Sequence, residues 1–235
     1  MKKIILNHKS YLTYNDMINF IKEFDNLDKS KYEFILFPQT IYLSMFVNKT
    51  CSLGTQNFYS SKEGSFTGEI NLESLKSINV KSTLIGQYER RKIMDEQFDE
   101  TKEKLFRSLN AKFNTFLCIG EDCKTNRPFL YIKRKLNSYL KSIEKSNLKY
   151  LSIVYEPSYS HSNAVSEDLN KISTTIDRIK SYVKSKYTLN VEVLYGGYIN
   201  EDNISQIINI CDGIVIGKQS TNIKELIILL KKINK

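Results

Sequence analysis

One carboxylate, that of Glu156, stands directly between an apolar run and a proline. The run Leu151–Tyr155 has the composition of a buried strand, and Pro157 stops it. A carboxylate at the end of a buried strand is costly unless it faces a polar cavity. Glu156 is therefore a candidate general base, although an ordinary acidic loop residue would give the same pattern in this stretch.

A cation and an amide follow the first apolar run, residues 4–6. Asn7 and Lys9 alternate along the chain, so in an extended segment their side chains point to one side and His8 points to the other. Lys9 is a candidate to bind an anionic substrate, and His8 is expected to pack in the interior. Four more residues stand at the ends of apolar runs: Gln87, Gly196, Gly197 and Gly217.

These residues form one site only if the ends of their strands meet. A lysine, a carboxylate, an amide and glycine loops around one rim suit proton abstraction next to a carbonyl group in an anionic substrate. Each glycine taken alone is more typical of a turn. The arrangement of the strands therefore decides whether the set is functional.

Eight apolar runs predict strands, and segments with helical spacing of apolar residues separate them. The predicted strands are residues 4–6, 34–37, 51–55, 82–85, 113–118, 151–155, 191–195 and 213–216. Such alternation indicates parallel pairing with the helices outside. We predict an α/β fold, a single (β/α)8 barrel domain over residues 1–235. The alternative is an open doubly wound sheet, which would more often show a glycine-rich turn after its first strand, and residues 7–9 are not one.

Three local predictions concern the connections. A short helix is predicted over residues 43–47, and the loop over residues 56–69 is too long to be an idle connection. Ser166 is predicted to cap the following helix, with Glu167 and Asp168 in its first turn.

The chain is basic, with 35 Lys and Arg residues against 26 Asp and Glu residues and a formal charge of +9. A basic balance favours anionic partners, either nucleic acid or phosphorylated metabolites. The lysines are scattered, and the densest clusters, residues 90–92 and 133–135, are short. We interpret most of these cations as a solvated surface, and we expect a small anionic sugar-phosphate substrate and no nucleic acid.

The four cysteines are widely spaced, and no pair has zinc-ligand spacing. They are expected to be reduced thiols, and we expect no metal and no cofactor. No apolar run approaches the length of a membrane span, and the first run is too short for a signal peptide. We therefore expect a cytoplasmic protein with no membrane association.

Several segments together carry a family resemblance along nearly the whole chain. They are Asn7-His8-Lys9, Gly54-Thr55-Gln56-Asn57, Ser65-Phe66-Thr67-Gly68-Glu69-Ile70, Ile85-Gly86-Gln87-Tyr88-Glu89-Arg90-Arg91, Cys118-Ile119-Gly120-Glu121, Tyr155-Glu156-Pro157, Leu194-Tyr195-Gly196-Gly197 and Ile216-Gly217. In this order the sequence resembles triosephosphate isomerases. The resemblance implies the barrel fold and the interconversion of dihydroxyacetone phosphate and glyceraldehyde 3-phosphate through an enediolate.

The resemblance also implies roles for individual residues. Glu156 matches the general base, and Lys9, with Asn7 beside it, matches the cation that holds the substrate and stabilises the enediolate. Glu89 matches an acidic partner of that lysine. Residues 158–165 lie where the family keeps a closing lid, and Cys118 matches a buried cysteine behind the site. The segment Phe66, Thr67, Gly68 and Glu69 matches a loop that the family inserts into a neighbouring subunit, which implies a homodimer.

The departures from the family pattern gather at the same places. Gln87 stands where the family has histidine, and an amide can donate a hydrogen bond to an oxyanion but cannot shuttle a proton. Tyr88 replaces a serine in the same motif. At the phosphate end, Tyr198 replaces a serine after the two glycines, and Lys218 replaces the second of two adjacent glycines.

The lid segment has no glycine, and Tyr159 takes the place of a tryptophan. His161 in that segment has no family counterpart, and we interpret it as a solvent-facing loop residue.

Three interpretations stay open at this point. The first is a divergent triosephosphate isomerase with reduced or altered activity. The second is an isomerase of a different small sugar or sugar phosphate, because the base and the lysine are kept while the phosphate end has changed. The third is a non-catalytic barrel, because the changes lie where activity needs accurate placement.

Overall fold

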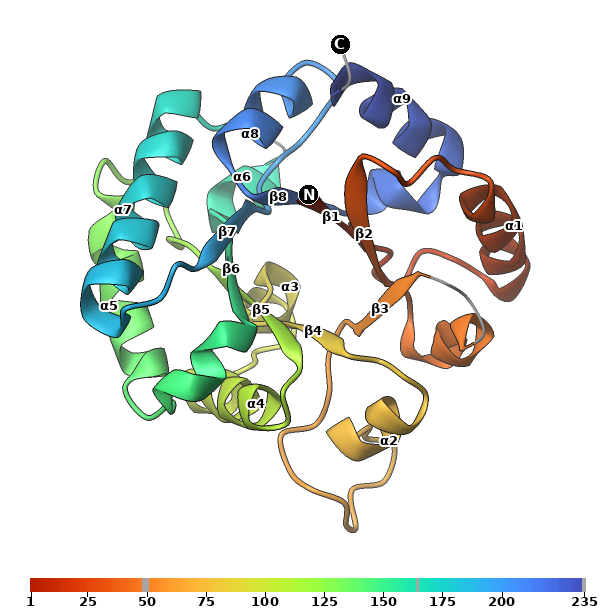
Figure 1. The fold of residues 1–235 in the computed structure, drawn as a ribbon, viewed down its shortest axis with the longest axis horizontal. Helices are drawn as coiled ribbons and strands as arrows, with labels where there is room; N and C mark the ends of the chain where they lie inside the picture. Colours follow the sequence, from red (N-terminus) through yellow and green to blue (C-terminus); the bar gives the residue numbers. More distant parts are fainter. Residues whose placement is uncertain (48–50, 164, 234–235) are drawn as a thin grey trace.

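The computed structural model describes residues 1–47, 51–163 and 165–233, without the side chains of residues 161–163. Within these residues, eight parallel strands close into a barrel in which each strand pairs with the next and β1 pairs with β8 (Figure 1). The strands are β1 (Lys2–Asn7), β2 (Tyr32–Phe37), β3 (Ser52–Thr55), β4 (Ser82–Ile85), β5 (Asn114–Ile119), β6 (Leu151–Tyr155), β7 (Glu192–Tyr195) and β8 (Gly213–Ile216). The predicted (β/α)8 barrel is confirmed, and the open sheet is wrong.

Helices surround the barrel (Figure 1). The α-helices are α1 (Tyr14–Asp25), α2 (Leu72–Ser77), α3 (Tyr88–Lys92), α4 (Phe98–Asn110), α5 (Pro128–Leu140), α6 (Ser158–Asn163), α7 (Leu169–Tyr187), α8 (Ile204–Ile210) and α9 (Ile223–Ile233). Three 3-10 helices are η1 (Thr40–Phe46), η2 (Lys145–Tyr150) and η3 (Lys218–Thr221). Alternate strand residues point outward toward these helices and form the larger apolar core with them.

The remaining strand residues fill the barrel itself. This inner core contains Ile5, Ile35, Phe37, Leu84, Phe116, Cys118, Val154 and Leu194. A Cβ atom at Gly54 would overlap the Phe37 ring, so the aromatic side chain uses the space that the glycine leaves. The barrel is therefore a packed core, and its chemistry is confined to the loops at the carboxyl ends of the strands.

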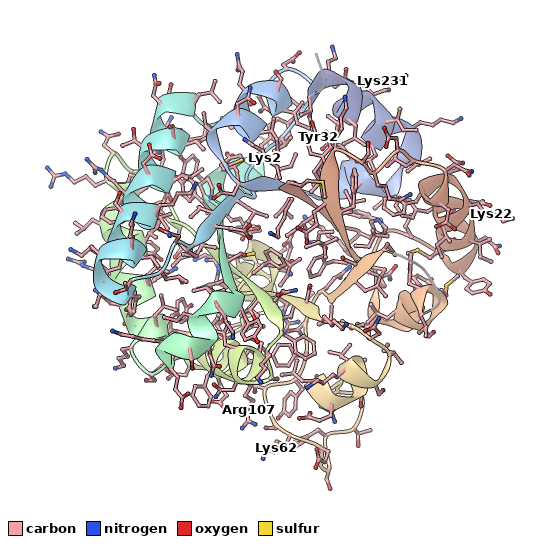
Figure 2. The ribbon with its side chains drawn as sticks, in the orientation of Figure 1. Lys2, Lys22, Tyr32, Lys62, Arg107 and Lys231 are labelled. Carbon is pink, nitrogen blue, oxygen red and sulfur yellow. The ribbon has the colours of Figure 1, made fainter. Side chains whose placement is uncertain are left out.

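The chain between β3 and α2 projects away from the body of the barrel (Figure 1). Among the described residues, no helix combines the length and the apolar character needed to cross a membrane. Lys22, Lys62, Arg107 and Lys231 lie at the periphery in Figure 2. These four cations fit the scattered basic surface that we inferred from the sequence.

The local predictions need three corrections. The helix predicted over residues 43–47 is the 3-10 helix η1, which ends at Phe46. Several strand bounds also differ: β1 and β2 begin two residues earlier than predicted, β3, β5 and β7 begin one residue later, and β1 and β5 end one residue later. Ser166 does not cap α7, because Asp168 stands directly before the helix and its carboxylate accepts the Lys171 amide hydrogen at 2.9 Å. The Ser166 hydroxyl instead accepts a hydrogen bond from the Asn203 amide group at 3.0 Å.

Candidate active site

The predicted site residues lie on one rim. Asn7 ends β1, Gln87 follows β4, and Glu156 follows β6, while the glycine positions follow β7 and β8. All strands of the barrel are parallel, so these carboxyl ends meet at the same mouth. The strand ends therefore meet, which is the condition that the sequence left open.

Lys9 reaches the rim through a turn rather than through strand alternation. Its φ angle is +48°, in the left-handed region that residues with a side chain seldom adopt. The Gln56 amide group donates to the Lys9 carbonyl at 3.0 Å and to the Phe37 carbonyl at 2.8 Å, which fixes this turn. The alternation of side chains along a strand, which we expected to bring Asn7 and Lys9 together, is therefore not the reason that they meet. The turn brings them together, and the Lys9 backbone N–H donates to the Asn7 side chain at 3.2 Å.

His8 points away from the site. It is fully buried, and its ring meets the Phe20 ring edge-on with centroids 4.5 Å apart. Burial lowers the pKa of His8 to about 4, so the imidazole is neutral at neutral pH. This histidine packs behind the site, as the sequence predicts.

The start of α3 holds the other rim residues through three consecutive positions. The side-chain oxygen of Gln87 accepts a hydrogen bond from the side-chain amide of Asn7 at 3.1 Å. The next residue, Tyr88, donates its backbone N–H to Glu156 Oε2 at 2.8 Å. The residue after that, Glu89, forms an ion pair with Lys9. One short segment therefore ties together the candidate base, the candidate cation and the amides.

Gln87 keeps a donor for a ligand. Its Nε2 donates to the Gln56 carbonyl at 3.1 Å. A carboxamide nitrogen carries two hydrogens, so Gln87 can donate one more hydrogen bond toward the mouth. It has no group that titrates near neutral pH, and the arrangement can polarise an oxygen without exchanging a proton with it.

Glu156 is a buried carboxylate, 6% exposed. Its Oε2 lies 3.8 Å from Nη2 of Arg91, whose side chain is only 10% exposed. Arg91 is therefore an exception to the solvated surface that we inferred for most of the cations. Sequence reasoning missed Arg91 as a member of the site, and the available signal was its place in the same matched segment as Gln87 and Glu89.

A groove opens beside Lys9 and Gln87. Its volume is about 590 Å³, and its lining includes Tyr11, Ile93 and Met94. The last two are apolar and yet 64% and 62% exposed. The groove therefore joins a polar end at the candidate site to an open apolar end.

On the β7 and β8 side of the rim, glycines stand where a side chain would meet its neighbours. A Cβ atom at Gly196 would lie 2.6 Å from a Val154 methyl carbon, and one at Gly197 would overlap the Tyr195 hydroxyl. A Cβ atom at Gly217 would lie 3.3 Å from Cε of Lys9, so the Lys9 side chain runs alongside this glycine.

Tyr198 and Lys218, which the resemblance singles out on this side, lie in different surroundings. Tyr198 is half-buried, and its N–H donates to the Ser160 hydroxyl at 3.2 Å. Lys218 is exposed, and its ammonium lies 5.8 Å from the centre of the Tyr11 ring. Lys218 therefore adds a cation at the edge of the mouth.

The segment predicted as a lid, residues 158–165, begins as the short helix α6. Its Tyr159 hydroxyl accepts a hydrogen bond from Lys171 Nζ at 2.7 Å. Lys171 also pairs with Glu167 at 2.7 Å and lies 3.7 Å from the buried Glu121. Residue 164 and the side chain of His161 lie outside the part of the chain that the structure describes.

Thiols and metal-ligating side chains are not gathered at this rim. Cys118 is buried in the barrel, and burial raises the pKa of its thiol. In residues 1–47, 51–163 and 165–233, no group of three or more His, Cys, Asp or Glu side chains could hold a metal ion.

A closed barrel with a lysine, an amide and a buried carboxylate on one rim belongs to the class of (β/α)8 proteins that keep their chemistry at the carboxyl ends of the strands. The model of the triosephosphate isomerase family matches residues 2–233. The chain therefore belongs to the triosephosphate isomerase family, and the resemblance that the motifs indicate is confirmed.

Curated relatives agree with this assignment. The chain is 30% identical over 229 residues to a triosephosphate isomerase of Ureaplasma parvum, covering 95% of each chain. It is 29% identical over 235 residues to one of Mycoplasma genitalium, also with 95% coverage of each. It is 34% identical over 203 residues to one of Campylobacter jejuni, covering 85% of each.

Proposed function

We propose that this protein interconverts dihydroxyacetone phosphate and glyceraldehyde 3-phosphate by proton transfer. The observation that carries the proposal is the start of α3, where residues 87–89 contact Asn7, Glu156 and Lys9 in turn. These contacts support a single polar cup that contains both a base and a cation. Such a cup suits removal of a proton next to a carbonyl and stabilisation of the resulting enediolate.

The proposed reaction assigns one task to each side chain. The Glu156 carboxylate takes a proton from C1 of dihydroxyacetone phosphate, and the electron pair moves onto the carbonyl oxygen to give the enediolate. The Lys9 ammonium and the free N–H of Gln87 stabilise that oxygen. The protonated Glu156 then returns a proton to C2, which gives the aldehyde and restores the carboxylate.

The transfer between the two substrate oxygens is the demanding step. One hydroxyl proton has to move from O1 to O2, and Gln87 cannot carry it. We assign this step to Glu156 as well: the protonated Glu156 gives the C1 proton to O2, the restored carboxylate takes the proton of O1, and this second proton is the one returned to C2. Absence of a positioned acid–base group typically costs about 10² to 10⁴ in rate, so we expect reduced turnover.

The phosphate is assigned to the β7 and β8 side. The Gly196 N–H donates to the Tyr155 carbonyl at 2.9 Å, so the phosphate is assigned to the N–H groups of Gly197 and Gly217. Tyr198 and Lys218 border this region, and they favour a second candidate function, isomerisation of a different small sugar phosphate. A third candidate, a barrel that binds without catalysis, follows if Glu156 never leaves the Tyr88 amide.

A turnover assay separates these functions. Both triose phosphates are offered to the wild-type protein and to Glu156→Gln, beside a panel of other aldose and ketose phosphates. We expect conversion of the triose phosphates by wild type and none by the variant. Conversion of only another sugar phosphate would establish the second candidate, and no conversion with retained binding would establish the third.

We further propose a homodimer in which the projecting loop of one subunit occupies the groove of the other. Phe66 lies in this loop and is 40% exposed, although its ring contacts Tyr59 with centroids 4.7 Å apart. Gly68 has a φ of +89°, which allows a tight turn beside Thr67 and Glu69. The apolar end of the groove, at Ile93 and Met94, suits such an insertion.

Sedimentation tests the dimer. We expect wild type to sediment as a dimer and Phe66→Asp to sediment as a monomer with a folded spectrum. A monomeric wild type would refute the proposed assembly. The cytoplasmic location stays a prediction from the sequence.

A further inference from the structure

Arg91 is anchored to three neighbouring loops of the rim. Its Nε donates to the Gly86 carbonyl at 2.7 Å, at the end of β4. Its Nη1 donates to Asp122 at 2.9 Å, beyond β5, and its Nη2 donates to the Ser158 hydroxyl at 3.4 Å, beyond β6. A guanidinium held at this many points has little freedom to move.

The contact from Arg91 to Glu156 is of a different kind. The Nη2 to Oε2 distance of 3.8 Å is an ion-pair distance and too long for a hydrogen bond. The hydrogen bond to Oε2 comes from the Tyr88 amide instead. A turn of Glu156 toward a substrate would therefore break the bond to the Tyr88 amide without breaking a hydrogen bond to Arg91.

The charges around Glu156 come from several elements. Arg91 and Glu89 lie on α3, Cys118 lies on β5, and Asp122 lies in the loop after it. Lys9, from the end of β1, is paired with Glu89. Burial opposes the charge of Arg91, but Glu156 and Asp122 raise its pKa, so this cation is present throughout the working pH range.

Asp122 is shared among several cations. It lies 3.5 Å from Lys92 and 3.7 Å from Lys135, and it accepts the Tyr131 hydroxyl hydrogen. Although burial opposes ionisation, these partners lower the pKa of Asp122 to about 2. The anion therefore offsets part of the positive charge that faces Glu156.

We propose that Arg91 is a positioning residue, a fixed cation that keeps the Glu156 carboxylate ionised and aligned between the Tyr88 amide and the substrate. The inference rests on the proposed function of Glu156 as the base. Arg91 does not touch the reacting atoms. The positive charge of Arg91 acts on the Glu156 carboxylate, and the negative charge of Asp122 weakens this effect.

The pH dependence of kcat/KM tests this role. The acid limb reports ionisation of the base in the free enzyme. An opposite charge at this range typically lowers a carboxylate pKa by about 1 to 3, so Arg91→Met moves the acid limb upward by about one pH unit or more. Arg91→Lys, which keeps the charge, moves it less. Arg107→Met on α4 is the matched control. Arg107 pairs with Glu103 at 2.7 Å, away from the rim, so this variant leaves the acid limb unchanged.

A second variant predicts the opposite sign. Asp122→Asn removes the anion that offsets Arg91, so the acid limb moves downward. This variant retains the guanidinium and its bond to the Gly86 carbonyl, and it tests the inference even if Arg91→Met does not fold. The inference is overturned if the acid limb of Asp122→Asn stays at the wild-type pH or moves to higher pH. It is also overturned if Arg91→Met folds and its acid limb stays at the wild-type pH.

Titration of labelled glutamate by NMR separates this inference from the proposed function. The Glu156 resonance is assigned as the signal lost in Glu156→Gln. If the protein converts no triose phosphate but the Glu156 pKa rises in Arg91→Met, the proposed function fails and the positioning role stands. If turnover is present and the Glu156 pKa is the same in both proteins, the function stands and the positioning role fails.

Discussion

On the β1 and β4 side of the rim, polar side chains bind one another, whereas on the β7 and β8 side glycines let neighbouring side chains pack closely against the backbone. The first region, the acid–base side, contains Asn7, Lys9, Gln56, Gln87 and Glu89, joined by hydrogen bonds and an ion pair. The second region, the glycine side, contains Gly196, Gly197 and Gly217 with Tyr198 and Lys218.

The two sides therefore differ in how a substitution acts. On the acid–base side the Gln87 side chain joins the network through both its carbonyl oxygen and its amide nitrogen. On the glycine side a methyl group already meets a neighbouring side chain at Gly196 and Gly197. Changes on the first side should therefore alter kcat, and changes on the second side should alter KM and stability.

The largest effect should come from the acid–base side. Lys9→Met removes the cation at the mouth and leaves Glu89 without that ion pair. We expect kcat/KM to fall by about 10³-fold, mainly in kcat, because a positioned donor to an oxyanion is worth about this much. Steady-state kinetics on both triose phosphates measures it. A loss confined to KM would show that Lys9 only binds.

Gln87→His should act in the opposite direction. An imidazole at this position can exchange a proton with the substrate oxygens, so we expect kcat to rise by about 10²-fold. Gln87→Leu is the control, because it removes both the donor and the acceptor, and kcat should fall. An unchanged kcat in Gln87→His would mean that transfer between the oxygens does not limit the reaction.

Gly197→Ala should produce a smaller change of a different kind. The added methyl group meets the Tyr195 hydroxyl, and overpacking of this sort costs about 1–3 kcal/mol of the free energy of unfolding. If the same overlap weakens substrate binding by about 1.4 kcal/mol, KM rises about tenfold. Urea unfolding and kinetics measure the two effects. Pairing the change with Tyr195→Phe, which removes the hydroxyl, should restore part of both.

Lys218→Ala should have the smallest effect. The ammonium is exposed and contacts the Tyr11 ring, so its charge is screened by water and salt. We expect KM to rise by less than about threefold at low salt and to match wild type at high salt. A tenfold rise that persists at high salt would place Lys218 in direct contact with the phosphate.

Much of the fold follows from the sequence because each apolar run is long enough to form a strand and each intervening segment has helical spacing. The rim follows too, since parallel strands put their carboxyl ends together. Local choices between similar residues do not follow. Ser166 and Asp168 both have side chains that cap helices, and the spacing to the first helical residue, which decides between them, is visible only in the folded chain.

The site was only partly predictable for a related reason. Lys9 and Asn7 were paired by a rule for strands, but a left-handed turn brings them together. Arg91 looked like surface in a basic run, yet its neighbours Arg90 and Lys92 are more exposed, with side chains 32% and 42% accessible. Burial of a single member of a charged run depends on tertiary contacts, which local sequence does not encode.

Solvent hydrogen exchange during turnover tests whether Glu156 moves the proton. Dihydroxyacetone phosphate is converted in D₂O, and the glyceraldehyde 3-phosphate is analysed for deuterium at C2. We predict that wild type places solvent deuterium at C2, because Glu156 carries the proton and exchanges it with water, and that Glu156→Gln forms no product. Turnover by Glu156→Gln at the wild-type rate, with or without deuterium at C2, would contradict a carboxylate that moves the proton.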